Sequence, residues 1–144
     1  MANKDGSFVV IFKDDSRKEV FLVFRSDMPI WNLPGGGVEA DETPETAVIR
    51  ETYEETDFKL EIVQKLGVYN NIDVKTGEIW NRAHLFEGRI ISGIFKPEFE
   101  GCKGEWFSVD NLPSEIRPVT RVRVADTLAF GGTQFLKDFN RYPI

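Results

Sequence analysis

The stretch Leu33–Thr56 reads LPGGGVEADETPETAVIRETYEET and places three adjacent glycines ahead of a run rich in carboxylates. Thr43 is a suitable N-cap and Pro44 suits the first helical position, so the spacing predicts a helix that ends near residue 56. The acidic positions on one face of this helix are Glu51, Glu54 and Glu55. Like charges at this spacing destabilise a helix, so something outside it must offset them.

Another face of the predicted helix is expected to pack through its apolar or semi-apolar residues. These are Val48, Ile49, Thr52 and Tyr53. A solvated acidic face is the ordinary explanation of such a charge run. Arg50, however, is the single cation between residues 35 and 58. A divalent cation such as Mg²⁺ or Mn²⁺ would supply the missing charge, since both prefer oxygen ligands and bridge to phosphate oxygens.

The composition indicates one globular domain that spans residues 1–144, with 41% hydrophobic and 29% charged residues. A net charge of −6 disfavours binding to polymeric nucleic acid or to an anionic membrane. Cys102 is the single cysteine, which excludes an internal disulfide and fits a reducing compartment. Because no apolar run suits a signal peptide or a membrane span, we expect a cytoplasmic protein.

The remaining segments predict a mixed sheet with helices packed against it, that is, an α+β or α/β domain. Two short apolar segments, 8–12 and 20–24, are expected to pair as a hairpin, and the glycine-rich stretch 31–38 is expected to be a loop. Further strands are expected at 60–69, 79–91 and 105–109. A helix over 119–130 should end at Gly131 and Gly132, before a short final turn.

The segment from Gly36 to Phe58 resembles the signature of the Nudix hydrolases, G-x₅-E-x₇-R-E-U-x-E-E-x-G-U, where U is a bulky apolar residue. The charged positions of the pattern are all filled, by Glu42, Arg50, Glu51, Glu54 and Glu55. Two positions depart from it. Thr52 stands where a larger aliphatic residue is usual. Asp57 replaces the last glycine, so it must adopt the left-handed conformation that Asp tolerates.

The resemblance implies an α/β/α sandwich around a mixed β-sheet and a family that hydrolyses diphosphate linkages by attack of metal-activated water. By position it implies Glu51, Glu54 and Glu55 as ligands of Mg²⁺ or Mn²⁺, with the Gly36 carbonyl as a fourth. Arg50 resembles the residue that orients a signature glutamate, and together with Glu54 and Glu55 it forms the expected catalytic set. The implied substrate is a small nucleotide: a nucleoside triphosphate, a dinucleoside polyphosphate or a nucleotide sugar.

Family members often draw a further carboxylate from the loop before a strand of the form E-W-F-S. Glu100 is the first candidate for this metal ligand, followed by Glu98 and Glu105. The candidates for substrate contacts are aromatic, basic or amide residues: Arg25, Trp31, Tyr69, Arg82, and less directly Asn70, Trp80 and His84. Burial in the core or solvation at the surface is the alternative for each of them.

Two other functions remain open at this point. A Nudix-like sensor would bind a nucleotide without cleaving it, although a pure binder has no need of the complete charged set. A structural domain would use the cation only to stabilise its fold. Ile116 falls near the place where MutT-type enzymes carry a purine-reading asparagine, so the substrate stays undecided. The sequence also leaves open whether the chain forms a homodimer.

Overall fold

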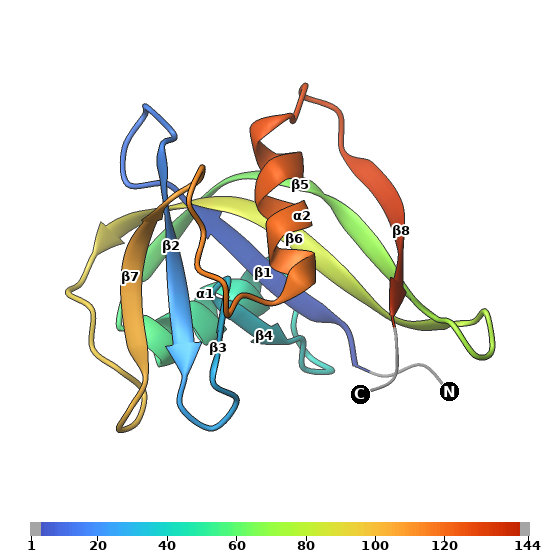
Figure 1. The fold of residues 1–144 in the computed structure, drawn as a ribbon, viewed down its shortest axis with the longest axis horizontal. Helices are drawn as coiled ribbons and strands as arrows, with labels where there is room; N and C mark the ends of the chain where they lie inside the picture. The colour runs from blue at the N-terminus through green and yellow to red at the C-terminus, as the bar shows by residue number, and fades with distance from the viewer. Residues whose placement is uncertain (1–3, 142–144) are drawn as a thin grey trace.

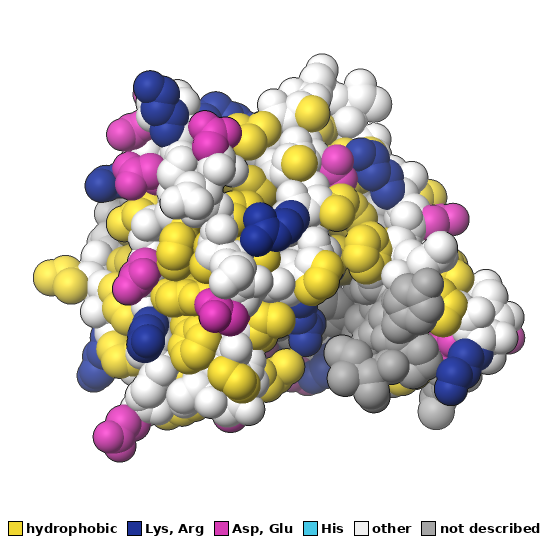
Figure 2. Space-filling model, viewed as in Figure 1, with side chains coloured by type: hydrophobic (Ala, Val, Ile, Leu, Met, Phe, Trp, Pro, Cys, Tyr) yellow, Lys and Arg dark blue, Asp and Glu magenta, His cyan; other side chains and the backbone are white. Residues whose placement is uncertain are grey.

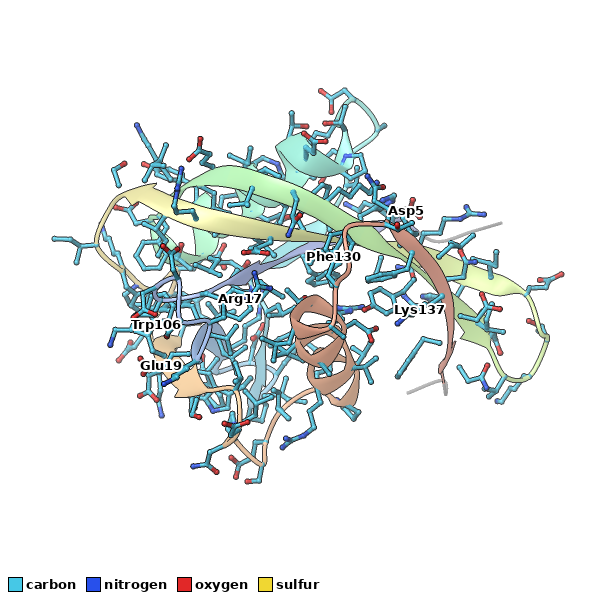
Figure 3. The ribbon with its side chains drawn as sticks, turned by 90° about the horizontal axis from the view of Figure 1, so that it is seen from above. Asp5, Arg17, Glu19, Trp106, Phe130 and Lys137 are labelled. Carbon is cyan, nitrogen blue, oxygen red and sulfur yellow. The ribbon has the colours of Figure 1, made fainter. Side chains whose placement is uncertain are left out.

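The strands of the protein form two sheets, and a helix lies on either side of the larger one (Figures 1 and 3). The computed structural model describes residues 4–141. Its elements are β1 (Gly6–Ile11), β2 (Glu19–Arg25), β3 (Ile30–Asn32), β4 (Gly35–Gly37), α1 (Pro44–Thr56), β5 (Lys59–Asp73), β6 (Ile79–Ser92), β7 (Lys103–Ser108), α2 (Pro118–Leu128) and β8 (Phe135–Arg141).

The larger sheet has the strand order β4-β1-β6-β5-β8 and is mixed, since β1 runs parallel to β6 and β5 runs parallel to β8. The smaller sheet, β3-β2-β7, is antiparallel. Seen from above, α1 lies over one face of the larger sheet and α2 lies under the other (Figure 3). The expected sandwich of helices around a mixed sheet is confirmed.

Strand β1 lies between two apolar clusters because both of its faces are buried. Val10 contributes to a cluster shared with α2, together with Val20, Leu22, Trp31, Leu33, Leu66, Tyr69, Ala83, Leu85, Ile116 and Val124. Val9 and Ile11 contribute to a cluster shared with α1, together with Phe21, Val23, Val48, Phe58, Leu60 and Phe86. The two helices are therefore fixed against opposite faces of one central strand.

Helix α1 has the ends that its sequence predicts. The Thr43 side chain accepts a hydrogen bond from the Thr46 backbone N–H, and Asp57 takes the left-handed conformation with φ 68°. The expected packed face is half correct: Ile49 and Tyr53 are 37% and 46% exposed. The buried positions are Ala47, Val48, Thr52 and Thr56. With these positions buried, Glu51 and Glu55 face the glycine-rich strand β4.

The predicted hairpin of the first two strands is wrong. β1 belongs to the larger sheet and β2 to the smaller one, and a single bridge between Phe12 and Val20 joins their ends. Both segments are apolar on both faces, which is typical of central strands that find partners on each side. The hairpin signal was local, whereas both strands pair with segments far along the chain.

The glycine-rich stretch is not a plain loop, because β3 and β4 occupy part of it. β4 pairs with β1, and a Cβ at Gly35 would lie 2.2 Å from the Ser7 carbonyl oxygen. Only glycine allows the two backbones this approach. The expected final turn is also wrong, because β8 extends the larger sheet beside β5. The other predicted strands and the second helix are present with shifted ends.

Candidate active site

Arg50 joins helix α1 to the segment that precedes it. Its guanidinium donates to both carboxylate oxygens of Glu42, from Nε at 2.7 Å and from Nη2 at 2.8 Å. Nη1 donates to Glu54 Oε1 at 2.9 Å and to Glu51 Oε1 at 3.2 Å, and Nη2 also reaches the Gly37 carbonyl at 3.2 Å. Such planar, two-pronged contacts fix the carboxylates in both position and rotamer.

The same network sets the charge of Glu42. The Arg50 guanidinium, with a backbone hydrogen bond from Glu39, lowers the pKa of the Glu42 carboxyl to about 2. This carboxylate is therefore ionised under all ordinary conditions. Glu42 accepts from Nε and Nη2 of Arg50. Nη1 is therefore left to donate to Glu51 and Glu54 on the helix.

Glu51 and Glu55 lie against the glycine strand. A Cβ at Gly36 would lie 2.5 Å from Glu51 Cδ, so only a glycine leaves room for this carboxylate. The Gly35 backbone N–H donates to Glu55 Oε1 at 2.8 Å. Burial raises the pKa of Glu55 to about 8, and burial also raises the pKa of Glu51. The negative charges of these two groups are poorly solvated and close to each other.

The donor set suits a hard divalent cation. Carboxylate oxygens from three glutamates and the carbonyls of a glycine strand are the ligand types that Mg²⁺ and Mn²⁺ prefer. Within residues 4–141, no three His, Cys, Asp or Glu side chains already form a compact metal cluster. Arg50 instead engages Glu51 and Glu54. Because a cation would reverse the upward pKa shifts of Glu51 and Glu55, these residues fit such an ion.

A fourth carboxylate acts on this cluster from the segment before β7. The charge of Glu98 raises the pKa of both Glu51 and Glu55. The Glu100 backbone carbonyl accepts from the Ser26 hydroxyl at 3.1 Å. Glu105 lies within β7, opposite a residue of β2. Of the three candidates from the sequence, Glu98 is therefore the one whose charge acts on Glu51 and Glu55.

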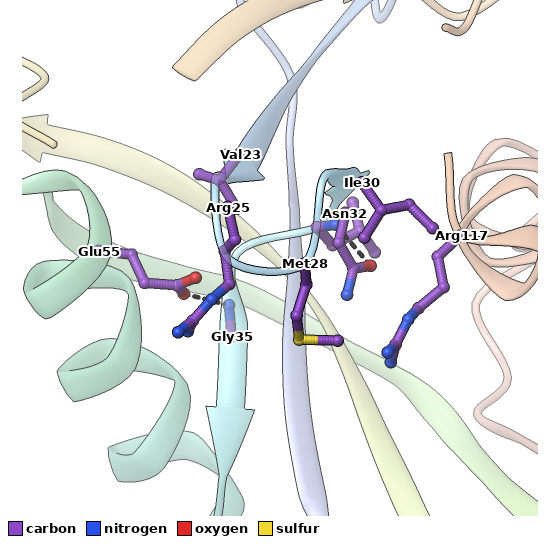
Figure 4. A pocket seen from close by; sticks show the side chains of 9 residues that line it. Val23, Arg25, Met28, Ile30, Asn32, Gly35, Glu55 and Arg117 are labelled. Carbon is purple, nitrogen blue, oxygen red and sulfur yellow. Dashed lines mark hydrogen bonds between the residues drawn. The ribbon is translucent and has the colours of Figure 1, made fainter. Parts of the chain in front are cut away.

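A pocket with a volume of about 100 Å³ adjoins the acidic cluster and is open to solvent. Its lining residues are Val23, Arg25, Met28, Ile30, Asn32, Leu33, Gly35, Glu55 and Arg117. Figure 4 shows Glu55 and Arg25 beside Gly35 on one side, Met28 in the middle and Arg117 on the far side. Arg25 also forms a two-pronged ion pair with Asp27. Glu55 thus belongs to both the cluster and the pocket.

Asn32 presents a hydrogen-bond donor to this pocket. Its Oδ1 accepts from the Leu33 backbone N–H at 2.8 Å and from the Thr120 hydroxyl at 2.6 Å. Because a backbone N–H can only donate, the oxygen end of the amide is fixed and the nitrogen points the other way (Figure 4). Arg117 is positioned by backbone pairing, since its N–H donates to the Trp31 carbonyl at 3.1 Å.

Comparison with known proteins shows the family to which this chain belongs. A model of the NUDIX domain matches residues 3–126. The chain belongs to the Nudix family. It is similar to a MutT-like protein of Streptomyces ambofaciens, with 32% identity over 85% of this chain and 75% of that protein. It is likewise 32% identical to a putative 8-oxo-dGTP diphosphatase of Bacillus subtilis, over 84% of this chain and 77% of the relative.

A solved structure agrees with this assignment. The MutT NUDIX hydrolase from Burkholderia pseudomallei superimposes with a TM-score of 0.71 at 29% identity, covering 85% of this chain and 96% of that one. The match covers nearly the full length of that hydrolase. The chain is accordingly a pyrophosphatase of the Nudix type.

Other residues expected to contact the substrate lie in varied places in this Nudix fold. Trp31 is 8% exposed and packs against Phe24 and Phe107, while Tyr69 is 1% exposed and donates to Asp126 at 2.7 Å. Arg82 and Asn70 are paired across β6 and β5. The structure therefore brings Arg25 into the pocket and leaves Trp31 and Tyr69 in the core.

Two further candidates for substrate contacts, His84 and Trp80, do not line the pocket. His84 lies between Asp5 and Lys65, with Nε2 at 3.2 Å from Asp5 Oδ2. Trp80 is 38% exposed on β6. Asn32 and Arg117 were missed by sequence reasoning, although each stands next to a marked feature: the glycine stretch for Asn32 and a helix-opening proline for Arg117.

The face drawn in Figure 2 carries charges of both signs. In the view of Figure 2, Lys and Arg side chains are scattered among acidic and apolar ones, so the described part of this face carries no continuous basic stripe. Nucleic-acid backbones bind to such stripes. In the described part of the chain, neither helix has the length and apolar character needed to cross a bilayer.

Proposed function

We propose that this Nudix hydrolase cleaves the diphosphate linkage of a small nucleotide, with Mg²⁺ or Mn²⁺ as its cofactor. The substrate is a nucleoside triphosphate, a dinucleoside polyphosphate or a nucleotide sugar. The observation that carries the proposal is the position of Glu55, which accepts from Gly35 within the acidic cluster and lines the pocket beside Arg25. A diphosphate placed there would meet carboxylates suited to cations on one side and a guanidinium on the other.

Each residue of the signature has a role in this proposal. Glu51, Glu54, Glu55 and the Gly36 carbonyl would hold the cation. When bound, the ion would offset the charge of the diphosphate and acidify the attacking water. Glu54 and Glu55 orient that water, and Arg50 keeps Glu54 in one rotamer through its 2.9 Å contact. Glu98 takes the place first given to Glu100 as the distal carboxylate, because its charge reaches Glu51 and Glu55.

The pocket would bind the rest of the nucleotide. Met28, Ile30 and Leu33 provide apolar surface for a ribose or a base, while Asn32 and Arg117 provide donors. Arg25 is the phosphate contact, because it lines the pocket next to Glu55. Its ion pair with Asp27 is exposed, and its guanidinium lies over the Phe99 ring. An exposed pair of this kind contributes little to stability, so Arg25 can exchange Asp27 for a phosphate at small cost.

Replacing this phosphate contact should weaken substrate binding more than turnover. For Arg25→Gln we expect KM to rise about tenfold, which corresponds to about 1.4 kcal/mol, with kcat within about twofold of the wild type. Steady-state kinetics on the preferred substrate measure both constants. Arg89→Gln is the matched control, since Arg89 is an exposed arginine on β6 that pairs with Glu61 away from the pocket. An unchanged KM for Arg25→Gln would remove this residue from the site.

A screen of purified protein tests the proposed function. Nucleoside triphosphates, dinucleoside polyphosphates, ADP-ribose and nucleotide sugars are incubated with Mg²⁺ or Mn²⁺, and the phosphate products are resolved by chromatography. We expect cleavage within one class of substrate, at the diphosphate linkage. If nucleotides bind and none is cleaved, the chain is a sensor and the hydrolase proposal fails. If nothing binds and Mg²⁺ only raises Tm, the cation serves the fold alone.

A further inference from the structure

Arg25 is held by an aromatic ring as well as by a carboxylate. Its guanidinium donates to the two carboxylate oxygens of Asp27, from Nε at 3.1 Å and from Nη2 at 3.0 Å. Its Cζ also lies 5.3 Å from the centroid of the Phe99 ring, which is close enough for a cation–π contact. The carboxylate occupies N–H donors at the edge of the guanidinium, whereas the ring covers its face. Phe99 therefore constrains the plane of Arg25 without occupying any of its donors.

A backbone turn places the Phe99 ring. The Cys102 backbone N–H donates to the Phe99 carbonyl at 3.2 Å, and Gly101 has φ 88°. A positive φ at the third residue of a turn is typical of type II and favours glycine. The Ser26 hydroxyl donates to the Glu100 carbonyl at 3.1 Å, and a Cβ at Gly101 would lie 2.7 Å from Ser26 Cβ. The turn is therefore fixed against the residue that directly follows β2.

This turn lies beside the charged groups of the candidate active site. Arg25 lines the pocket together with Glu55 (Figure 4). The hydrogen bonds that Arg25 donates to Asp27 raise the pKa of Arg25. The charge of Glu98, the residue before Phe99, raises it further, as does that of Glu55. Phe99 is not one of the residues that line the pocket, so it can affect a ligand there through Arg25.

The two contacts of Arg25 have different consequences for a phosphate. An arginine side chain has several rotatable bonds, and fixing them when a ligand binds reduces the affinity. A ring that already orients the guanidinium lowers this cost. Phosphate oxygens bind to the N–H edge, where Asp27 competes with them and Phe99 does not. Phe99 can therefore keep its contact while a phosphate replaces Asp27.

We infer that Phe99 is a positioning residue that orients the Arg25 guanidinium for contact with a phosphate of the substrate. This inference rests on the proposed function, which makes Arg25 the phosphate contact. It assigns to Phe99 an effect on substrate binding and not on the chemical step. Loss of the ring should therefore raise KM and leave kcat nearly unchanged.

Substitutions that separate the ring from its bulk test the inference. Phe99→Leu keeps an apolar side chain but removes the ring, and Phe99→Tyr keeps the ring. The side chain is 37% exposed and lies outside the two apolar clusters, so both variants should fold. On the preferred substrate we expect Phe99→Leu to raise KM about fivefold, which corresponds to about 1 kcal/mol. KM of Phe99→Tyr and kcat of both variants should stay within about twofold of the wild type.

Ile94→Ala is the matched control for these variants. Ile94 is an apolar residue of the same connection between β6 and β7 and is 87% exposed. Its KM should stay within about twofold of the wild type. An unchanged KM for Phe99→Leu, or an equal rise for Phe99→Tyr, would overturn the inference. A loss in kcat alone would also overturn it, because the effect would then lie in the chemical step.

A double-mutant cycle distinguishes positioning of Arg25 from a general structural role. In the Arg25→Gln background, Phe99→Leu should change KM by less than about twofold, because the group that the ring orients is already gone. A ring that only supports the turn would raise KM by the same factor in both backgrounds. Equal factors in the two backgrounds would therefore overturn the inference.

Binding of a diphosphate that cannot be hydrolysed separates this inference from the proposed function. Methylenediphosphonate with Mg²⁺ is titrated into each variant and followed by phosphorus NMR, which needs no turnover. We expect it to bind about fivefold more weakly to Phe99→Leu than to the wild type, and equally to Phe99→Tyr and the wild type. If this order is found and no nucleotide is cleaved, the positioning role stands and the hydrolase proposal fails. Equal binding to Phe99→Leu and the wild type, or no binding to either, overturns the positioning role.

Discussion

Glu54→Gln is expected to lower kcat at least about 100-fold, or about 2.7 kcal/mol in activation free energy, while the fold stays intact. The Glu54 side chain is 40% exposed, and the hydrogen bonds recorded for it come from Arg50 alone. The amide keeps the shape of the carboxylate but loses its charge, so it neither holds a cation well nor orients a water. Steady-state turnover and circular dichroism measure the two parts of this prediction.

Glu45→Gln is the matched control for that variant. Glu45 is also a glutamate of α1, but it is exposed in the first turn, away from the Arg50 network. We expect its kcat to stay within about twofold of the wild type, because surface substitutions outside special features rarely change function. Equal activity of Glu54→Gln and Glu45→Gln would remove Glu54 from the chemistry.

Gly35→Ala is expected to destabilise the protein by about 3 kcal/mol or more. Gly35 has φ 147°, where an L side chain is strained, and its added Cβ would lie 2.2 Å from the Ser7 carbonyl oxygen and 2.8 Å from Phe8 Cα. Both contacts are to backbone atoms, so no side-chain rotation relieves them. Urea unfolding at an unchanged m-value measures the loss.

Gly131→Ala provides the comparison for this substitution. Gly131 has no positive φ, and a Cβ there would meet no atom within 4 Å. Its stability should therefore change by less than about 0.5 kcal/mol. If Gly35→Ala were as stable as Gly131→Ala, the pairing of β4 with β1 would be looser than described. The hydrogen bond from Gly35 to Glu55 would then also be in doubt.

Features that depend on neighbours in sequence could be predicted before the structure was known. The start of α1 at Thr43 follows from capping, and the left-handed Asp57 follows from the small set of residues that accept that conformation. The signature glutamates were identified for the same reason, since their spacing along one helix determines their common face. The packed face of α1 was predicted only in part, because Ile49 and Tyr53 were expected to be buried and are exposed in the structure.

Features that depend on distant pairing could not be predicted. The two first strands separate because each finds partners in later parts of the chain, and β8 pairs with β5 across more than sixty residues. Asn32 and Arg117 were not singled out from the sequence, because they come together only where the chain around Trp31 meets the chain around Ile116.

In the function proposed above, the crowded carboxylates of α1 work with a divalent cation to cleave a diphosphate. The most direct test measures cleavage of the preferred nucleotide before and after removal of divalent cations by a chelator, followed by addition of Mg²⁺. We expect cleavage to fall to the uncatalysed background in chelator and to recover fully with Mg²⁺. Cleavage that continues unchanged in excess chelator would contradict it.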